Sequence, residues 1–480
     1  MATKLFIGGS WVDAHGEAFD TINPATEEVI REVGAANRSD VDAAVDAARA
    51  AFENPQWRRM PGVQRANLLF KLADALEQHA QEFAELETTD QGQPIGMALN
   101  FSVGSSVEHL RYYAGWATKI EGETVEVGFP ETFAYTQREP VGVCGLNTPW
   151  NVPLMILVWK IAPALATGNV VIVKPAEQTP LTTIRFVELC EEVGFPPGVV
   201  NLLTGAGDVG AALVEHQGVD KISFTGSTEV GRSIVRASAD NLKRVTLELG
   251  GKNPSIIGPD VDMDVAVGGN IAGATINSGQ VCAAYSRFYV AKKREDEFVT
   301  KVAGGLQGMT LGPGIEESSQ MGPLVSAEHL ANVSRMVDAG KESGAELVTG
   351  GARRGDKGFY YEPTIFRGVA DDSALATDEI FGPVMSVLTY DDEDELAALL
   401  KRANNTNYGL ASTIWSRDLG FVHRVAAGIR AGAVFVNMPP IPDMAMPWGG
   451  MKSSGWGREM GKYALEAFTE VKGVWVHYGE

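Results

Sequence analysis

The chain has 480 residues, of which 45% are hydrophobic and 21% charged, and its formal net charge is −21. This length and composition indicate a soluble globular protein with two or three domains. The negative charge disfavours binding to nucleic acid or to anionic membranes, because both attract a basic surface.

Signals for export, membrane insertion and metal binding are weak. The N-terminus carries no secretory signal, and no apolar run reaches the length of a transmembrane helix. The three cysteines, Cys144, Cys190 and Cys282, are too few and too widely spaced for a disulfide framework or a metal site. The seven histidines have no metal-ligand spacing. We therefore expect a cytoplasmic protein that uses no metal.

The N-terminal third is mostly helical by periodicity. Residues 41–52 and 65–88 carry apolar side chains at three- and four-residue spacing with charges between them, a pattern typical of amphipathic helices. Ser39 and Asp40 are candidates for the N-cap of the first of these helices.

From residue 141 onward, strands and helices alternate. Short runs rich in Val and Ile are each followed by a helical segment, which indicates βαβ units and a parallel sheet covered on both faces. Ligands bind at the carboxyl ends of the strands in such sheets. The predicted strands are 141–146, 170–173, 199–203, 221–225 and 244–249, and the predicted helices are 154–166, 181–193, a short one ending near 216, and 227–239.

A second α/β run begins near residue 254. Two further segments, 132–138 and 471–477, alternate like exposed strands and belong to neither run. Edge segments of this kind can pair with another subunit. The predicted strands of the second run are 287–290, 345–349, 384–390, 411–415 and 433–436, and its predicted helices are 293–306, 327–343, 394–404 and 419–429.

Cys282 is the most informative residue of the chain. It follows an apolar, Gly- and Ala-rich stretch at 265–276. A partly exposed cysteine is a usable nucleophile when a nearby group favours its thiolate. Upstream, Glu248 stands between two leucines, and apolar surroundings raise a carboxyl pKa towards the range of a general base. We interpret Cys144 and Cys190, which lie in apolar segments, as core residues.

Two glycine-rich turns compete as the binding site for a dinucleotide. Gly205, Gly207 and Gly210 spell G-x-G-x-x-G between a predicted strand and a helix, but the acidic residue expected about twenty positions further on is unclear. Gly226 and Ser227 also follow a strand and open a helix, where a phosphate can approach the backbone. Ser227 would equally serve as a plain N-cap.

The segment from Lys174 to Glu177 follows the second strand of the first α/β run. A carboxylate here can accept hydrogen bonds from ribose hydroxyls and would repel a 2′-phosphate. Glu177 therefore favours NAD over NADP without excluding NADP. The alternative is a solvated loop.

Seven motifs spread along the chain resemble the aldehyde dehydrogenase superfamily. Any one motif alone supports the resemblance only modestly, whereas the presence of all seven in the same order is specific to this superfamily. The resemblance implies an α/β fold with two Rossmann-like, doubly wound parallel-sheet domains and a small β oligomerisation element. The motifs are Pro149-Trp150-Asn151-Val152-Pro153, Lys174-Pro175-Ala176-Glu177, Phe224-Thr225-Gly226-Ser227-Thr228, Leu247-Glu248-Leu249-Gly250-Gly251-Lys252, Gly279-Gln280-Val281-Cys282, Glu379-Ile380-Phe381-Gly382-Pro383 and Pro447-Trp448-Gly449-Gly450.

The resemblance also implies how the chain is divided. Residues 1–120 and 140–249 would form the NAD-binding domain, and 250–449 the catalytic domain with the nucleophilic cysteine. Residues 121–139 and 466–480 would supply oligomerisation strands, which agrees with the two exposed segments noted above. A homo-oligomer, dimer or tetramer, is the expected assembly.

Three residues carry the chemistry that the resemblance implies. Cys282 would be the nucleophile, Asn151 and the Cys282 backbone N–H the oxyanion hole, and Glu248 the general base. The expected reaction oxidises a small-molecule aldehyde to the acid with NAD+, through a Cys282 thiohemiacetal, hydride transfer and Glu248-assisted thioester hydrolysis. Fixed donors to such an oxyanion typically contribute about 2.7–4 kcal/mol each.

The resemblance further implies a cofactor set and a substrate tunnel. An apolar tunnel without Arg or Lys favours hydrophobic or aromatic aldehydes, although Val152 and Trp448 replace a frequent phenylalanine and leave the tunnel shape open. Lys174 and Glu177 would hold the adenosine ribose, Gly226 and Ser227 the pyrophosphate and Glu379 the nicotinamide ribose, with Gly207 nearer the adenine and Phe381 and Trp150 packing alongside. The tunnel would be lined by Val152, Met155, Trp159, Val281, Pro442 and Trp448.

Three alternatives compete with this assignment. Transfer of the acyl group to coenzyme A is disfavoured by Glu248, which family members of that type usually lack. A non-catalytic relative is disfavoured because Cys282, Asn151, Glu248 and Glu379 are all intact. A cysteine hydrolase requires a partner histidine, and no motif places one near Cys282.

Overall fold

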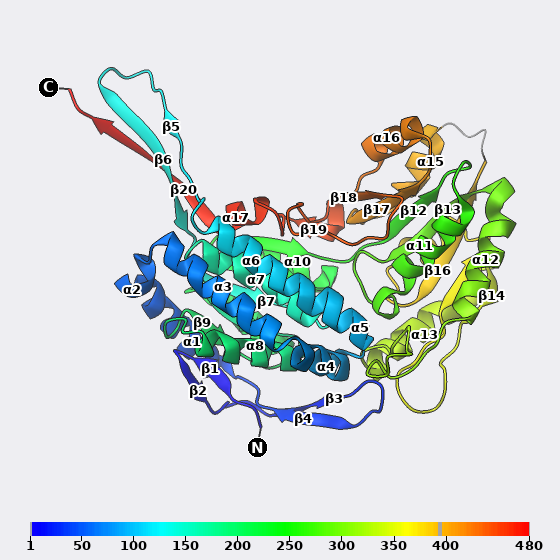
Figure 1. Ribbon diagram of the computed structural model, residues 1–480, viewed down its shortest axis with the longest axis horizontal. Helices are drawn as coiled ribbons and strands as arrows, with labels where there is room; N and C mark the ends of the chain where they lie inside the picture. The colour runs from blue at the N-terminus through cyan, green and yellow to red at the C-terminus, as the bar shows by residue number, and fades with distance from the viewer. Residues whose placement is uncertain (1, 392–395, 480) are drawn as a thin grey trace.

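A computed structural model of the chain describes residues 2–391 and 396–479. Two sheets with helices on their faces form two lobes, and a long arm projects from one of them (Figure 1). Among the described helices, none is both long and apolar enough to cross a membrane. Nor do three or more His, Cys, Asp or Glu side chains of the described residues group in a way that could hold a metal ion.

The first sheet has eight strands in the order β19-β11-β10-β7-β8-β9-β1-β2. Its five central strands are parallel, and the chain order reverses between β7 and β10. Ligands bind at such a reversal in doubly wound sheets. The strands are β7 (Val143–Asn147), β8 (Val170–Lys174), β9 (Val200–Leu202), β10 (Lys221–Thr225) and β11 (Arg244–Glu248), flanked by β19 (Gly455–Trp456), β1 (Leu5–Ile7) and β2 (Ser10–Val12).

The second sheet has seven strands in the order β14-β15-β16-β13-β12-β17-β18, and only β14 runs antiparallel to its neighbour. The two parallel sheets confirm the predicted α/β class. The strands are β12 (Asn253–Ile257), β13 (Tyr285–Ala291), β14 (Glu346–Thr349), β15 (Thr364–Arg367), β16 (Val384–Tyr390), β17 (Ala411–Trp415) and β18 (Ala433–Val436).

Helices cover both sheets (Figure 1). Helix α7 (Pro153–Ala166) lies in the interior, and every residue in it is buried. Around the first sheet lie α1 (Arg38–Glu53), α2 (Pro55–Arg58), α3 (Gly62–Gln78), α4 (Ala80–Gln91), α6 (Gly104–Trp116), α8 (Leu181–Glu192), α9 (Gly207–Glu215) and α10 (Thr228–Ser238). Around the second lie α11 (Met263–Thr275), α12 (Glu295–Gln307), α13 (Ala327–Glu342), α15 (Leu396–Ala403) and α16 (Leu419–Gly428).

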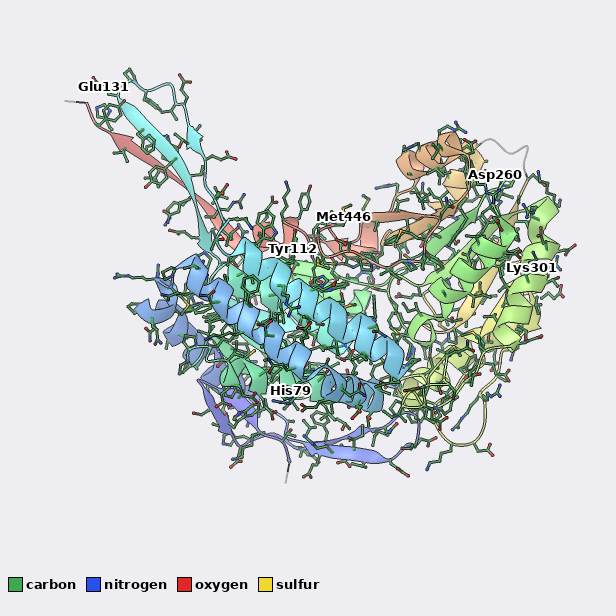
Figure 2. The ribbon with its side chains drawn as sticks, in the orientation of Figure 1. His79, Tyr112, Glu131, Asp260, Lys301 and Met446 are labelled. Carbon is green, nitrogen blue, oxygen red and sulfur yellow. The ribbon has the colours of Figure 1, made fainter. Side chains whose placement is uncertain are left out.

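The arm is a three-stranded antiparallel sheet. It consists of β5 (Thr124–Val125), β6 (Thr132–Pro140) and β20 (Thr469–His477), and β6 pairs with β20 along the full length of both strands. Figure 2 places Glu131 at the far end of this arm. The two exposed segments predicted at 132–138 and 471–477 therefore pair with each other within one chain.

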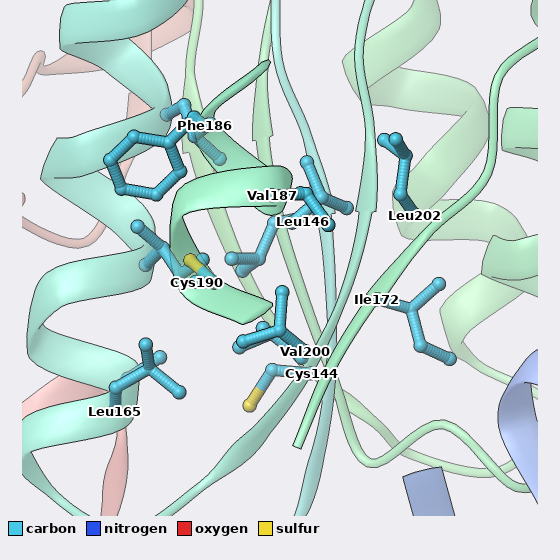
Figure 3. Close-up of a cluster of buried hydrophobic side chains, with 14 of the residues drawn as sticks. Cys144, Leu146, Leu165, Ile172, Phe186, Val187, Cys190, Val200 and Leu202 are labelled. Atoms are coloured by element: carbon cyan, nitrogen blue, oxygen red, sulfur yellow. The ribbon is translucent and has the colours of Figure 1, made fainter. Parts of the chain in front are cut away.

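Both remaining cysteines lie in the core of the first lobe. Cys144 of β7 and Cys190 of α8 are buried among aliphatic and aromatic side chains, among them Leu165, Ile172 and Phe186 (Figure 3). Burial raises the pKa of the Cys144 thiol to about 12 and raises that of Cys190 as well. Their interpretation as core residues is confirmed.

The N-terminal third departs from the expectation in three ways. It contains short strands, β1 to β4, with β3 (Phe19–Ile22) and β4 (Val29–Val33) forming a separate hairpin. The predicted helix over 65–88 is broken at His79 into α3 and α4. The predicted N-cap is wrong by two residues, because Asn37 caps α1 and Asp40 reaches back to the Asn37 backbone as the other half of a capping box.

In the second run, three elements next to the site escaped the sequence pattern: β12, α11 and β15. The helix α11 is rich in Gly and Ala and lacks a polar face, so its periodicity gives no helical signal. The first two residues of the helix predicted over 394–404 lie outside the described residues.

Candidate active site

A cavity of about 410 Å³ opens where the strand order of the first sheet reverses, at the carboxyl ends of β7, β8 and β10. This is where a doubly wound sheet binds its ligand. Six residues of the predicted cofactor set line it: Trp150, Lys174, Glu177, Gly207, Gly226 and Ser227.

The lining fits a polar, extended ligand such as a dinucleotide. Three buried side-chain oxygens in it, on Asn147, Thr148 and Thr225, have no hydrogen-bond partner among the described residues. Buried polar atoms are rarely left without a partner, so these oxygens are suited to ligand hydroxyls or amides. Helix α9 begins at Gly207 without a side-chain cap, and a Cβ at that glycine would meet open space.

Charged and capping groups define the two sides of this cavity. The Lys174 ammonium lies 3.5 Å from the Glu177 carboxylate, and burial lowers the pKa of Lys174. On the other side, the Ser227 hydroxyl accepts a hydrogen bond of 3.2 Å from the backbone of Val230, so this residue is an N-cap as well as a wall of the cavity. The N-cap interpretation of Ser227 is confirmed, whereas its contact with a pyrophosphate stays a prediction.

Gly226 joins the cavity to the strand that carries Glu248. Its backbone N–H donates to the Glu248 carbonyl at 3.0 Å. A Cβ here would come within 2.5 Å of the Phe224 ring, so a larger residue would displace the turn.

Glu379 and Phe381 lie outside the lining of this cavity but next to it. The backbone N–H of Gly251 donates to the Glu379 carboxylate at 2.8 Å, and burial raises the pKa of Glu379 to about 7. Phe381 meets the Trp150 ring edge-on at a centroid distance of 5.3 Å. Because Trp150 lines the cavity, these contacts bring the Glu379 segment from the second lobe to the cofactor side.

Cys282 follows a loop whose backbone adopts the left-handed conformation. Helix α11 ends at Thr275, and Asn277, Ser278 and Gly279 then have φ values of 48°, 58° and 73° in succession. Left-handed non-glycine residues are uncommon, and such strain is stored where surrounding structure fixes it. A Cβ on Gly279 would lie 2.2 Å from the Gly382 carbonyl, so the loop passes tightly against the Glu379 segment.

Amide side chains fix this loop from both lobes. Asn253 of β12 donates to the carbonyls of Cys282 at 2.7 Å and Ala284 at 2.9 Å. Asn277 donates to the backbone carbonyl of Asn151 at 2.7 Å, and the Asn151 amide donates to the Gln280 carbonyl at 2.9 Å. An amide carries two N–H groups, so Asn151 keeps one donor for a ligand beside Cys282.

The Cys282 side chain is half-buried, which favours the protonated thiol over the thiolate. Burial, together with the neighbouring carboxylates of Glu248 and Glu379, raises the pKa of its thiol. A thiolate is therefore not stored at this site, and the thiol must lose its proton during the reaction.

Glu248 ends β11 with a buried carboxyl group. Neither of its side-chain oxygens has a hydrogen-bond partner among the described residues. Burial, reinforced by the nearby Glu459 charge, raises the Glu248 pKa well above its ordinary value. This is the direction expected from the apolar flanks of Glu248, and a raised pKa suits a carboxyl group that acts as a general base.

Comparison with known proteins identifies this arrangement. The sequence model of the aldehyde dehydrogenase family matches residues 11–474. The chain belongs to the aldehyde dehydrogenase family. The resemblance drawn from the seven motifs is thereby confirmed.

Relatives match the chain over nearly its whole length, and solved structures of the family share its fold. The mitochondrial aldehyde dehydrogenase of Homo sapiens is 45% identical over 480 residues, which covers 99% of this chain and 92% of that protein. The NAD+ complex of an aldehyde dehydrogenase from Bacillus cereus superposes with a TM-score of 0.98 at 45% identity, covering 100% of this chain and 97% of the other. Betaine aldehyde dehydrogenase from Staphylococcus aureus in complex with NAD+ gives 0.97 at 37% identity, covering 99% and 95%.

Cys282 packs against a cluster of buried apolar side chains. Five of the six residues predicted to line the substrate tunnel belong to this cluster. The sixth, Pro442, is half-buried and lies outside the cluster. The cluster also includes Phe101 and Phe435, which the sequence did not indicate. The five are Val152, Met155, Trp159, Val281 and Trp448.

A buried ion pair behind Glu248 was missed by the sequence reasoning. Lys160 of α7 is fully buried and pairs with Glu459, while Ser223 donates to the same Glu459 oxygen at 3.3 Å. The other Glu459 oxygen has no partner among the described residues. The sequence signal for this ion pair is Lys160 within an otherwise apolar helix, because a buried ammonium group requires a partner.

Proposed function

We propose that the protein oxidises an aldehyde to the carboxylic acid with NAD+, with Cys282 as nucleophile and water as the final acyl acceptor. The observation that carries this proposal is the juxtaposition of three groups around Cys282. These are a thiol on a loop fixed by both lobes, an amide donor from Asn151 and an unpaired buried carboxyl group from Glu248.

The first chemical step belongs to Cys282. Its sulfur adds to the aldehyde carbon, and the carbonyl oxygen becomes an oxyanion that the Asn151 amide and the Cys282 backbone N–H can stabilise. The amide is neutral, so it does not pair permanently with the thiolate. Because burial raises the pKa of the thiol, its proton must pass to water as the C–S bond forms, and this step does not require Glu248.

The second step is hydrolysis of the thioester left on Cys282. Glu248 would take a proton from the attacking water, and its raised pKa suits a base that works near neutral pH. The buried pair of Lys160 and Glu459 lies behind it and offers a route by which that proton can leave the interior.

NAD+, when bound, supplies the hydride acceptor for the oxidation. Lys174 and Glu177 would hold the adenosine ribose, Gly226 and Ser227 the pyrophosphate, and Glu379 the nicotinamide ribose. The carboxylate of Glu177 on the cavity wall disfavours a 2′-phosphate and so favours NAD over NADP. The Bacillus cereus and Staphylococcus aureus relatives are described as NAD+ complexes.

Hydrophobic or aromatic aldehydes are the proposed substrate class. The cluster around Cys282 consists of aliphatic, aromatic and Met side chains. Burying apolar substrate surface against it contributes about 25 cal/mol per Å².

A homo-oligomer of two or four chains is the proposed assembly, in the cytoplasm. The arm exposes large apolar side chains along its strands, including Phe133, Trp475 and Val476. An exposed apolar sheet of this kind normally marks an interface.

An aldehyde panel assayed with both cofactors and with product analysis tests the proposed function. We expect apolar aldehydes to yield NADH and free acid, and a Cys282→Ala variant to yield neither. Formation of acyl-coenzyme A in preference to free acid would exclude water as acceptor. Full NADH production by Cys282→Ala would exclude the nucleophile.

A further inference from the structure

A second cavity, of about 630 Å³, lies at the root of the arm, far from the site described above. It is bounded by α2, the start of α3, the end of α6 and the final residues of β6. Four arginines line it, Arg58, Arg59, Arg65 and Arg138. The volume is within the range of about 300–1,000 Å³ that is typical of small-molecule sites.

The arginines of this cavity are not neutralised by acids. No salt bridge joins any of the four to a carboxylate among the described residues, whereas arginines elsewhere, such as Arg185 and Arg367, hold several acids each. This is notable in a chain with a net charge of −21. Four unpaired guanidinium groups in one cavity create a local positive potential that attracts anions.

Two of the arginines are positioned by the protein. Arg65 donates to the carbonyls of Ala166 at 3.0 Å and Met60 at 2.5 Å, and Arg138 donates to the Thr469 hydroxyl at 3.3 Å. These bonds use Nε and Nη1 of Arg65 and Nη1 of Arg138, so an Nη2 group of each has no partner among the described residues. Fixed guanidinium groups lose little side-chain entropy when they bind an anion.

The other two arginines stand at the exposed rim. Arg58 lies with its guanidinium 5.7 Å from the centre of the Phe52 ring, which also lines the cavity. Arg59 has no side-chain hydrogen bond within the described chain. The single carboxylate in the lining, Glu139, is already paired with Lys472 on the neighbouring strand and does not compensate the arginines.

The start of α3 adds to the positive potential. This helix has 17 residues, and Pro61 at its N-cap provides no side-chain hydrogen bond. Gly62 and Val63, its first two residues, line the cavity. The N-terminus of a helix carries partial positive charge and free N–H groups, both of which favour an anion.

We propose that this cavity binds a small anion with two or more phosphate groups. Guanidinium groups bind phosphate oxygens in a bidentate manner, and four of them exceed what a single carboxylate or monophosphate can use. The ligand would contact β6 at Arg138 and would therefore bind where the arm joins the first lobe. The site is independent of the proposed oxidation.

Binding of inorganic pyrophosphate to the full chain, measured by calorimetry with saturating NAD+ present, tests this proposal. The NAD+ occupies the cofactor cavity and removes it as a competing site. We expect about one pyrophosphate per chain, and binding at least about tenfold weaker in the double variant Arg58→Gln/Arg59→Gln, because two charge-assisted contacts are lost. A matched double variant, Arg424→Gln/Arg430→Gln, removes the same charge elsewhere and should bind as the unmodified protein does.

Three results would overturn the proposal: absence of binding, equal loss in both double variants, or unchanged binding in Arg58→Gln/Arg59→Gln. Citrate at matched ionic strength should bind more weakly, and equal affinity for citrate would refute the preference for phosphate. Should the rim variant fail to fold, hydrogen exchange on the unmodified protein decides instead. Pyrophosphate should then slow exchange at residues 62–65 and 137–140, and unchanged exchange there would contradict the site.

Discussion

Burial sets the chemistry of individual residues in this protein. The Cys282 thiol and the Glu248 carboxyl both have raised pKa values, because both lose hydration and each disfavours a second negative charge nearby. Both shifts favour the uncharged forms of the two side chains.

The turnover rate should rise with pH as Glu248 loses its proton. The group acts as a base only when ionised, and its raised pKa moves that ionisation from the acidic range towards neutral pH. We expect kcat for a fast-reacting aldehyde to increase about tenfold per pH unit on the acidic side of this pKa. Steady-state kinetics between pH 5.5 and 9 would show it, and a rate independent of pH would contradict the role.

Alkylation should distinguish Cys282 from the other two cysteines. Cys144 and Cys190 are buried in the core, whereas Cys282 is half-buried at the site. We expect iodoacetamide to modify Cys282 alone in the native protein, faster at higher pH, and all three thiols after unfolding. Peptide mass spectrometry would measure this, and labelling of Cys144 before unfolding would show that the core is more open than described.

At the scale of elements, alternating strands and helices with clear hydrophobic runs were predictable. The strands β10, β16, β17 and β18 begin and end where the sequence indicated. The elements that hold Cys282 were not predictable, because α11 lacks amphipathicity and the left-handed loop after it is fixed by contacts distant in sequence. Cys282 and Glu248 stood out from the sequence itself, the family resemblance supplied the other proposed site residues, and neither pointed to Lys160 and Glu459.

Gly279 provides a test of how strictly the loop must be held. Substitution by alanine would place a Cβ 2.2 Å from the Gly382 carbonyl at a φ of 73°, so the loop must shift. We expect Gly279→Ala to lower kcat by at least about 100-fold, as small misplacements of reacting groups do. Gly344→Ala is the matched control, because that glycine has a φ of 87° and open space around its Cβ position.

Both substitutions should cost similar backbone strain, of about 1–2 kcal/mol, but only Gly279→Ala should reduce activity. Thermal unfolding and steady-state kinetics on the two variants would separate the effects. Equal activity in both variants would show that the tight contact with Gly382 does not position Cys282.

At the scale of the whole molecule, buried polar groups make stability depend on pH. Glu87 of α4 is fully buried, Gln93 donates to it at 2.8 Å, and burial raises its pKa to about 7. The folded state thus holds a proton that the unfolded state releases above a pH of about 4.5. The contribution of Glu87 to stability is fully present below that pH and is lost as the pH rises through about 7.

A Glu87→Gln variant should remove this dependence. The amide keeps the acceptor for Gln93 and cannot ionise, so the variant should be more stable than the unmodified protein above pH 7, by up to about 3 kcal/mol at 1.36 kcal/mol per pKa unit. Below a pH of about 5 the two should be similar. Thermal melts across this range would measure the difference, and a variant that is less stable at pH 8 would contradict the assignment.

Accumulation of an acyl group on Cys282 in a Glu248→Gln variant is the most direct test of the central claim. After mixing with an apolar aldehyde and NAD+, we expect a burst of about one NADH per chain, slow turnover afterwards and an acyl adduct on Cys282 in the intact mass. Rapid quenching with mass spectrometry measures the adduct, and Cys282→Ala is the control without one. Wild-type turnover in Glu248→Gln, or a burst without an adduct on Cys282, would contradict the account.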